Sequence, residues 1–270
     1  MSFEPDDLAA ASDLPEIVRL VRARTPARLL VGRAGAAYRT TTQIELRKAH
    51  AAARDAVRAE LNLERDFGAA FVERWNLCEV STQATNKDEY LLRPDLGRCF
   101  SEDSRLELSL AQRFSRANDL QIAIGDGLSV TAVSKQVPPL LELLRERARE
   151  RKWTTGQPFV IRHCRVGILN EIGELLAPRV TILLIGERPG LATAESLSAY
   201  LAYQPQKNHT DANRNLISNI HARGVSTQDA ALRIINLAAK MMAAGTSGYQ
   251  LREELLPRAG AEKLSQGPIP

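Results

Sequence analysis

The chain has 270 residues, enough for one large domain or two smaller ones. Its 44% hydrophobic and 25% charged residues are typical of a soluble globular protein. No stretch approaches the roughly 20 apolar residues that are needed to span a membrane. Its net charge is +4, but cations are interspersed with acids and aromatic residues make up only 5%, so neither nucleic acid nor a membrane is an expected partner. Three scattered cysteines and an acidic N-terminus without a secretory signal predict a cytoplasmic protein with no disulfide framework and no zinc site.

The N-terminal region, residues 1–75, has a mostly helical pattern. DLPEIVRLVRA (13–23) places its apolar residues at intervals of three and four. TQIELRKAHAAARDAVRAEL (42–61) is rich in alanine and in charged residues that favour helices. Between these two predicted helices, the stretch 27–40 contains GRAG (32–35), which we expect to form a loop.

From about residue 76, apolar runs alternate with amphipathic segments. The runs that resemble strands are LCEVST (77–82), LQIAI (120–124), FVIRHCRV (159–166) and VTILLIG (180–186). The segments that resemble helices are 101–115, a stretch that follows 125–129 and ends near Trp153, 168–177 and 226–245. In the second of these, a fresh start of the helix after Pro138–Pro139 is an alternative to one continuous helix.

Strands that alternate with helices over short connections form βαβ units, in which the strands are parallel and the crossovers right-handed. VTILLIG shows little alternation of apolar and polar residues, as expected for a strand that helices cover on both faces. We therefore predict that residues 76–270 form a doubly wound, Rossmann-like α/β domain with a mainly parallel sheet, preceded by the helical region 1–75.

Polar residues follow a glycine at the ends of the predicted strands. Ligands of open α/β sheets bind outside the carboxyl ends of the strands, so Asp126, Val166 and Glu187 are expected to lie on one rim. The glycines let a bulky ligand approach the backbone, and Pro189 stops the last strand. The alternative is that GERPG (186–190) is only a strand-ending turn whose charged side chains pair with neighbours.

Several kinds of chemistry have no support in the sequence. There is no P-loop and no nucleophile motif, and GDGLSV (125–130) is only half of a dinucleotide fingerprint. The four histidines are far apart, and His163 and Cys164 point to opposite faces of a strand, so we predict no metal site. The residues by themselves predict an α/β domain with a polar strand-end site for a large or non-covalently held ligand.

Longer motifs carry a resemblance to a known family. The stretch 155–205, which contains RHCRV, GERPGL and SLSAY, and the following ISNIH (217–221) closely resemble the small subunit of adenosylcobalamin-dependent ethanolamine ammonia-lyase. The likeness extends to GRAG, to LLRPDLGR (91–98) and to GDGLS (125–129), and it covers nearly the whole chain after about residue 27.

The resemblance implies a heteromeric enzyme. A large subunit would bind ethanolamine, adenosylcobalamin would lie between the two subunits, and the products would be acetaldehyde and ammonia. The cofactor carries the radical chemistry, so the small subunit would hold no catalytic residue and would be inactive alone. Region 1–75 would dock to the large subunit. A bacterial microcompartment is an alternative location, although the chain begins close to GRAG and leaves no room for a long packaging segment.

The family's cofactor contacts correspond to Val166, Glu187 and Leu216, and no metal ligand is implied. Glu187 would accept hydrogen bonds from the amide side chains of the corrin, and Val166 would serve through its main chain. Leu216 stands where the family normally has a cysteine, so a backbone contact would survive there but a sulfur contact would not. The chain also lacks the D-x-H-x-x-G motif of another cobalamin fold, so no histidine should bind cobalt.

Two other hypotheses remain open from the sequence. One is a self-sufficient α/β enzyme that binds a dinucleotide at GDGLS (125–129). The other is a non-catalytic interaction protein that docks a partner through its helical N-terminal region and its basic surface.

Overall fold

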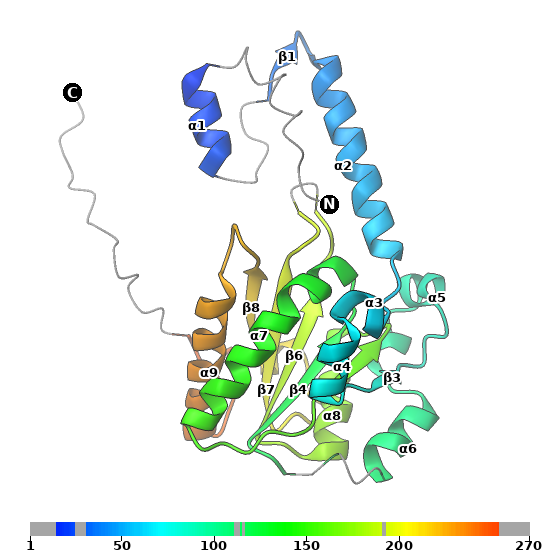
Figure 1. Ribbon diagram of the computed structural model, residues 1–270, viewed down its shortest axis with the longest axis vertical. Helices are drawn as coiled ribbons and strands as arrows, with labels where there is room; N and C mark the ends of the chain where they lie inside the picture. The colour runs from blue at the N-terminus through cyan, green and yellow to red at the C-terminus, as the bar shows by residue number, and fades with distance from the viewer. Residues whose placement is uncertain (1–14, 25–30, 111–113, 115–116, 191–192, 254–270) are drawn as a thin grey trace, which may run out of the picture.

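The computed structural model describes residues 15–24, 31–110, 114, 117–190 and 193–253. They form a mixed α/β fold in which helices cover both faces of a six-stranded sheet (Figure 1). The strands of this sheet are β3 (Glu79–Ser81), β4 (Leu120–Gly125), β5 (Phe159–Arg162), β6 (Val180–Gly186), β7 (Leu197–Tyr203) and β8 (Asn215–Ile220). The α-helices are α1 (Glu16–Arg24), α2 (Thr40–Arg58), α3 (Leu63–Phe67), α4 (Ala69–Trp75), α5 (Lys87–Leu92), α6 (Glu102–Leu110), α7 (Val130–Glu150), α8 (Leu169–Leu176) and α9 (Thr227–Ala244).

The sheet is mixed, with the strand order β3-β5-β4-β6-β7-β8. The first four strands of this order are parallel to one another, as predicted. Strands β7 and β8 were not predicted; β7 pairs antiparallel with β6, and β8 pairs antiparallel with β7. The connection 187–196 between β6 and β7 is too short for the crossover helix that a parallel neighbour needs, so β7 returns antiparallel. The sheet is therefore mixed: the predicted strands form its parallel part, and β7 and β8 add antiparallel pairs at one edge.

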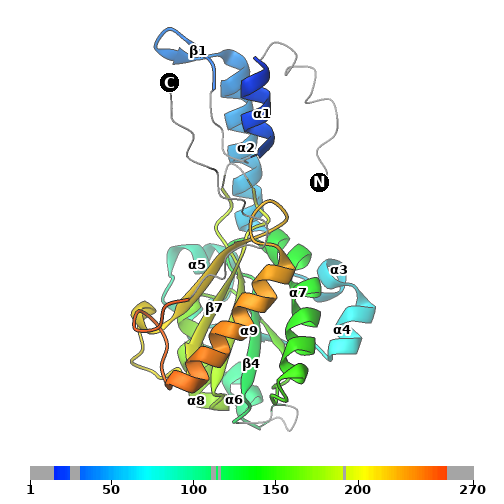
Figure 2. The ribbon, with the colours of Figure 1, turned by 90° about the vertical axis from the view of Figure 1, so that its left-hand side faces the viewer.

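Two hydrophobic clusters form the core. Helices α7 and α9 cover one face of the sheet and pack against each other, and α8 covers the other face (Figure 2). Strands β4 and β6 are buried along their whole length, which explains their continuous apolar sequences. Helix α9 lies within the predicted range 226–245: Ser226 is its N-cap, whose hydroxyl accepts from the Asp229 N–H at 3.1 Å, and Gly245 is its C-cap with φ +66°.

Helix α7 runs through Pro138 and Pro139 without a break, so the alternative of a fresh start there is wrong. A proline inside a helix costs about 3 kcal/mol. The helix nevertheless buries a full apolar face, which includes the fully buried side chains of Val133, Leu140 and Leu144. Each such side chain contributes about 1.5–3 kcal/mol when it leaves water, so packing outweighs the two prolines.

The N-terminal helices α1 and α2 lie at one end of the molecule, and α2 projects away from the sheet (Figures 1 and 2). GRAG (32–35) does not form an irregular loop, because β1 (Arg33–Ala34) and β2 (Ala37–Tyr38) pair as a small hairpin around Gly35, whose φ is +63°. Helices α3 and α4 instead pack partly against the sheet core. No helix in the described ranges is sufficiently long and apolar to cross a bilayer.

Candidate functional site

The carboxyl ends of β4, β5 and β6 surround a hollow of about 190 Å³, which the first residues of strand β7 also border. Its lining residues are Tyr90, Gly127, Leu128, Cys164, Arg165, Val166, Ile185, Gly186, Glu187, Arg188, Ser198 and Tyr200. Two predicted site residues, Val166 and Glu187, thus lie at one hollow. A broader depression, lined by Lys240 and Arg252 among others, lies at the C-terminal end of α9, at the other end of the sheet domain (Figure 1).

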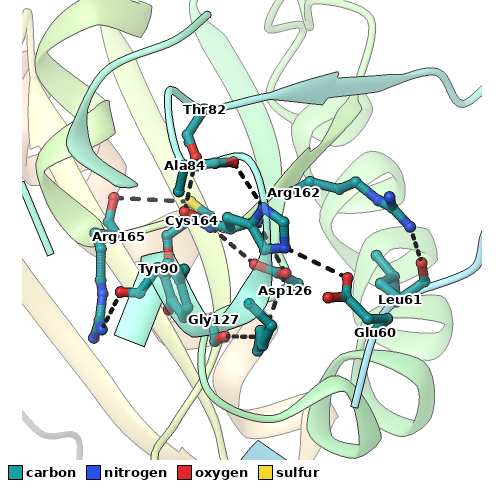
Figure 3. Close-up of polar contacts among 12 residues, drawn as sticks. Glu60, Leu61, Thr82, Ala84, Tyr90, Asp126, Gly127, Arg162, Cys164 and Arg165 are labelled. Atoms are coloured by element: carbon teal, nitrogen blue, oxygen red, sulfur yellow. Dashed lines mark hydrogen bonds and ion pairs between the residues drawn. The ribbon is translucent and has the colours of Figure 1, made fainter. Parts of the chain in front are cut away.

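Asp126 is on the predicted edge of the sheet but is fully buried beneath the rim. Its carboxylate accepts the backbone N–H of His163 at 3.0 Å and that of Cys164 at 2.9 Å (Figure 3). The Lys87 ammonium lies 3.6 Å from the same carboxylate and donates to the Gly127 carbonyl at 3.1 Å. The buried negative charge therefore has both hydrogen-bond donors and a counter-ion, as a buried carboxylate requires.

These bonds determine where β5 ends. The sequence predicted a strand over 159–166, but the chain leaves the ladder at His163, whose φ is +54°. A left-handed residue cannot continue a strand, and the two bonds to Asp126 hold the turn in place. Val166 consequently begins a short 3₁₀ turn over the end of the strand and does not lie within the sheet.

Tyr90 supports the same turn and lies beside Cys164 and Arg165 (Figure 3). Its fully buried hydroxyl donates to the Cys164 carbonyl at 3.0 Å. The Arg165 guanidinium lies 4.2 Å from the centre of the Tyr90 ring and donates to the Tyr90 carbonyl at 3.2 Å. Burial, with a smaller contribution from Asp126, raises the pKa of Tyr90, so its hydroxyl remains a donor.

His163 and Cys164 carry no separate chemistry. The His163 ring is held between the Ala84 carbonyl, 3.0 Å from Nδ1, and the Glu60 carboxylate, 3.4 Å from Nε2. Burial raises the pKa of the Cys164 thiol well above its usual value, so it is not a reactive thiolate. Within the described ranges, no three His, Cys, Asp or Glu side chains are grouped so as to hold a metal ion.

Glu187 is bonded to the two strands that the sequence did not predict. Its carboxylate accepts from the Ser196 hydroxyl at 2.7 Å, the Ser198 hydroxyl at 2.7 Å and the Asn219 N–H at 2.9 Å. An ionised carboxylate offers about four acceptor positions, so the donors among the described residues leave one of them unfilled. The alternative of a turn whose charged side chains pair with neighbours therefore holds for Glu187, whose neighbours are neutral donors. Arg188 is exposed, and the described part of the chain offers it no ion-pair partner.

Leu216 is not among the residues that line the hollow. It lies on β8 opposite Tyr200 of β7, and Tyr200 is the residue that borders the hollow. The Leu216 side chain is 46% exposed, so it is not part of the core. The third predicted position is therefore one strand farther from the hollow than Val166 and Glu187.

GDGLS (125–129) does not form a dinucleotide loop. Gly127 has φ +56°, and a Cβ there would lie 2.3 Å from the Gly186 carbonyl, so the glycine serves close packing against the end of β6. Ser129 is the N-cap of α7, where its hydroxyl accepts the Ala132 N–H at 3.2 Å. These residues therefore shape the end of β6 and the start of α7, and they leave the dinucleotide alternative without structural support.

Four residues that support the site were not identified from the sequence: Lys87, Tyr90, Ser196 and Ser198. Lys87 and Tyr90 lie on the short helix α5, which has no pattern of its own in the sequence. Ser196 and Ser198 belong to the SLSAY motif, so the motif that marked the resemblance was a usable signal for them.

The fold and the hollow define a class of protein: a mixed α/β domain with a small hollow at the carboxyl ends of its parallel strands. The model of the ethanolamine ammonia-lyase light chain family matches residues 15–252. The chain is 38% identical over 232 residues to the ethanolamine ammonia-lyase small subunit of Clostridium acetobutylicum, which covers 86% of this chain and 93% of that protein. It is 37% identical over 239 residues to the corresponding small subunit of Pseudomonas putida, with 87% and 86% covered. The chain belongs to the ethanolamine ammonia-lyase light chain family.

Proposed function

We propose that this chain is the small subunit of an ethanolamine ammonia-lyase and that its strand-end hollow forms one wall of the adenosylcobalamin cleft. The observation that carries the proposal is that Val166 and Glu187 border one hollow at the carboxyl ends of the parallel strands. The chain is thereby a subunit of a carbon–nitrogen lyase, and ethanolamine binds to the large (alpha) subunit.

The hollow fits one edge of such a cofactor. Pockets that enclose a whole ligand measure about 300–1,000 Å³. At about 190 Å³ this hollow is smaller, as expected where a second subunit supplies the rest of the cleft. The corrin periphery carries amide groups, and the free acceptor position of Glu187 suits an amide N–H.

Each residue of this chain has a binding or orienting role. A hydrogen bond from an amide to the ionised Glu187 contributes about 1.5–3 kcal/mol. Asp126 and Tyr90 hold the turn that presents Val166, so its main chain keeps a constant position. When bound, adenosylcobalamin supplies the radical chemistry that converts ethanolamine to acetaldehyde and ammonia. This chain contributes no proton donor or acceptor to that conversion and is inactive alone.

Leu216 is retained in the proposal as a main-chain contact near the edge of the cofactor. Its partner across the strands, Tyr200, borders the hollow, which supports a position at the rim. The leucine in place of the family cysteine removes any sulfur contact and leaves the peptide group unchanged.

We further propose that region 1–75 docks to the large subunit, chiefly through α1 and α2. Three large apolar side chains on these helices, Ile17, Leu20 and Ile44, are exposed. Exposed apolar residues on projecting helices are suited to a protein partner. We place the complex in the cytoplasm and keep packaging in a bacterial microcompartment as the alternative location.

Reconstitution tests the proposed function. The chain is co-expressed with a matching large subunit, adenosylcobalamin and ethanolamine are added, and ammonia release is measured with and without the chain. We expect ammonia only when every component is present. An intact complex that binds adenosylcobalamin but releases no ammonia would refute ethanolamine as the substrate. A complex that ignores the cofactor would refute the cobalamin wall and favour a non-catalytic interaction protein.

A further inference from the structure

We propose that Asn219, His221 and Gly224 form a clamp that positions the Glu187 carboxylate toward the hollow. This Glu187 clamp gives the ISNIH motif (217–221) a role that neither the fold nor the cofactor contacts explain. The inference rests on the proposed contact between Glu187 and the cofactor. Asn219 and His221 are positioning residues in it, since they act through Glu187.

The clamp begins with an irregularity in β8. The pairing of β7 and β8 shifts register between Leu197 and Ala199, so two strand residues on β8 stand where one would be expected. Asn219 has φ +61°, a left-handed conformation that asparagine tolerates better than most residues. A bulge of this kind re-aims a backbone group, and here the Asn219 N–H leaves the ladder and donates to Glu187 Oε1 at 2.9 Å.

His221 holds the side chain of the same asparagine. The His221 ring is only 4% exposed, and its Nε2 lies 2.7 Å from Asn219 Oδ1. The Arg223 N–H points to the other ring nitrogen, Nδ1, at 3.3 Å, so Nδ1 accepts and Nε2 carries the proton. Burial, and next the charge of Arg223, lower the pKa of His221 and so favour the neutral ring, whose tautomer the two hydrogen bonds select.

Gly224 closes the loop beneath Asn219. The Val225 N–H donates to the Asn219 carbonyl at 2.8 Å, and the Gly224 N–H donates to the His221 carbonyl at 2.9 Å. A Cβ on Gly224 would lie 2.2 Å from the Asn219 carbonyl oxygen, so no other residue fits without moving the bulge. The left-handed turn at Asn219 is thus secured on its side chain and on its carbonyl.

The clamp determines which Glu187 oxygen is available. Oε1 accepts both from Ser198 and from Asn219, whereas Oε2 accepts only from Ser196 among the described residues. The remaining acceptor position is therefore on Oε2. Without the Asn219 N–H, Oε1 would regain a free position, and the carboxylate could turn about its last bond.

The test compares His221→Leu with His221→Gln in the complex with the large subunit. Glutamine can place its amide N–H near the position of Nε2 and keep the donor, whereas leucine cannot. We expect His221→Leu to weaken adenosylcobalamin binding about tenfold, the effect of one hydrogen bond to a charged group, and His221→Gln to stay within about threefold of the parent. The thermal unfolding midpoint is recorded for both, to separate loss of folding from loss of orientation.

A double-mutant cycle makes the result specific to Glu187. In a Glu187→Ala background, His221→Leu should weaken adenosylcobalamin binding no further, because the group it positions is gone. An equal loss in both backgrounds would overturn the clamp. If Glu187→Ala weakens binding and His221→Leu does not, the clamp fails and the proposed function stands. If Glu187→Ala leaves binding unchanged, the proposed contact fails as well.

A second pair of variants covers the case in which His221→Leu does not fold. Asn219 is exposed, so its substitution leaves the core intact. Asn219→Gly removes the Oδ1 that His221 holds, but glycine adopts a left-handed φ without strain and does not need this anchor, so we expect its affinity for adenosylcobalamin to stay within about threefold of the parent. Asn219→Ala loses the anchor and is strained at the same φ, so it should weaken binding about tenfold. Equal affinity of the two variants would overturn the role of the left-handed turn.

Discussion

Asp126→Asn tests whether the buried carboxylate builds the turn that carries Val166. The substitution keeps the volume of the side chain but removes its charge and one acceptor oxygen. One of the two backbone N–H groups that Asp126 now satisfies would face an amide NH₂, and the Lys87 ammonium would lose its counter-ion. A hydrogen bond to a charged group contributes about 1.5–3 kcal/mol, so we expect the free energy of unfolding to fall by about 2–4 kcal/mol.

The measurement is urea unfolding of the isolated chain at 25 °C, followed by circular dichroism, with a thermal midpoint for comparison. A loss of this size lowers the midpoint of a domain of 150–250 residues by roughly 4–16 °C. The matched control is Asp119→Asn. That carboxylate also accepts a backbone N–H, from Thr154 at 2.9 Å, but it is partly exposed and pairs with Arg179 at the surface. We expect the control to cost at most about 1 kcal/mol. Equal losses at the two positions would refute the reasoning.

Three more outcomes are expected. Glu187→Ala should weaken adenosylcobalamin binding by the complex about tenfold while the chain stays folded, as titration and circular dichroism would show; unchanged affinity would remove Glu187 from the contacts. Leu216→Cys should be tolerated, with a midpoint within about 2 °C of the parent and equal or better cofactor affinity, because the side chain is 46% exposed; a large loss of soluble protein would contradict this. Because burial lowers the pKa of His221 from 6.5, the unfolded chain binds its proton more readily, and stability should fall as the pH drops below about 6.5. Between pH 7.5 and pH 5.5, the thermal unfolding midpoint of His221→Gln should fall by less than that of the parent. An equal fall in both proteins would show that other groups cause the pH dependence.

The local sequence pattern correctly predicted the parts of the fold that hydrophobic burial alone determines. VTILLIG and LQIAI are apolar throughout because both faces of β6 and β4 are buried, and both strands lie where they were expected. The common rim of Val166 and Glu187 followed from the direction of parallel strands alone.

The errors arose where a distant contact decides the local structure. The end of β5 depends on Asp126, which is 37 residues away from His163 in the chain. The continuity of α7 through Pro138 depends on the core that its other face buries. The direction of β7 follows from the short connection before it. Because the sequence pattern did not predict β7 as a strand, the length of this connection was not known from the sequence.

The hydrogen bonds that hold Glu187, at the end of β6, to residues of β7 and β8 and to Ser196 also affect the conformational entropy lost when a ligand binds. A glutamate side chain that becomes ordered loses about 1.5–2 kcal/mol of rotamer freedom. Three hydrogen bonds impose this order on Glu187 when the sheet forms. The loss therefore belongs to folding, and a ligand that reaches the hollow meets an acceptor that is already oriented. Affinity gained at this contact is not reduced by the cost of ordering the side chain.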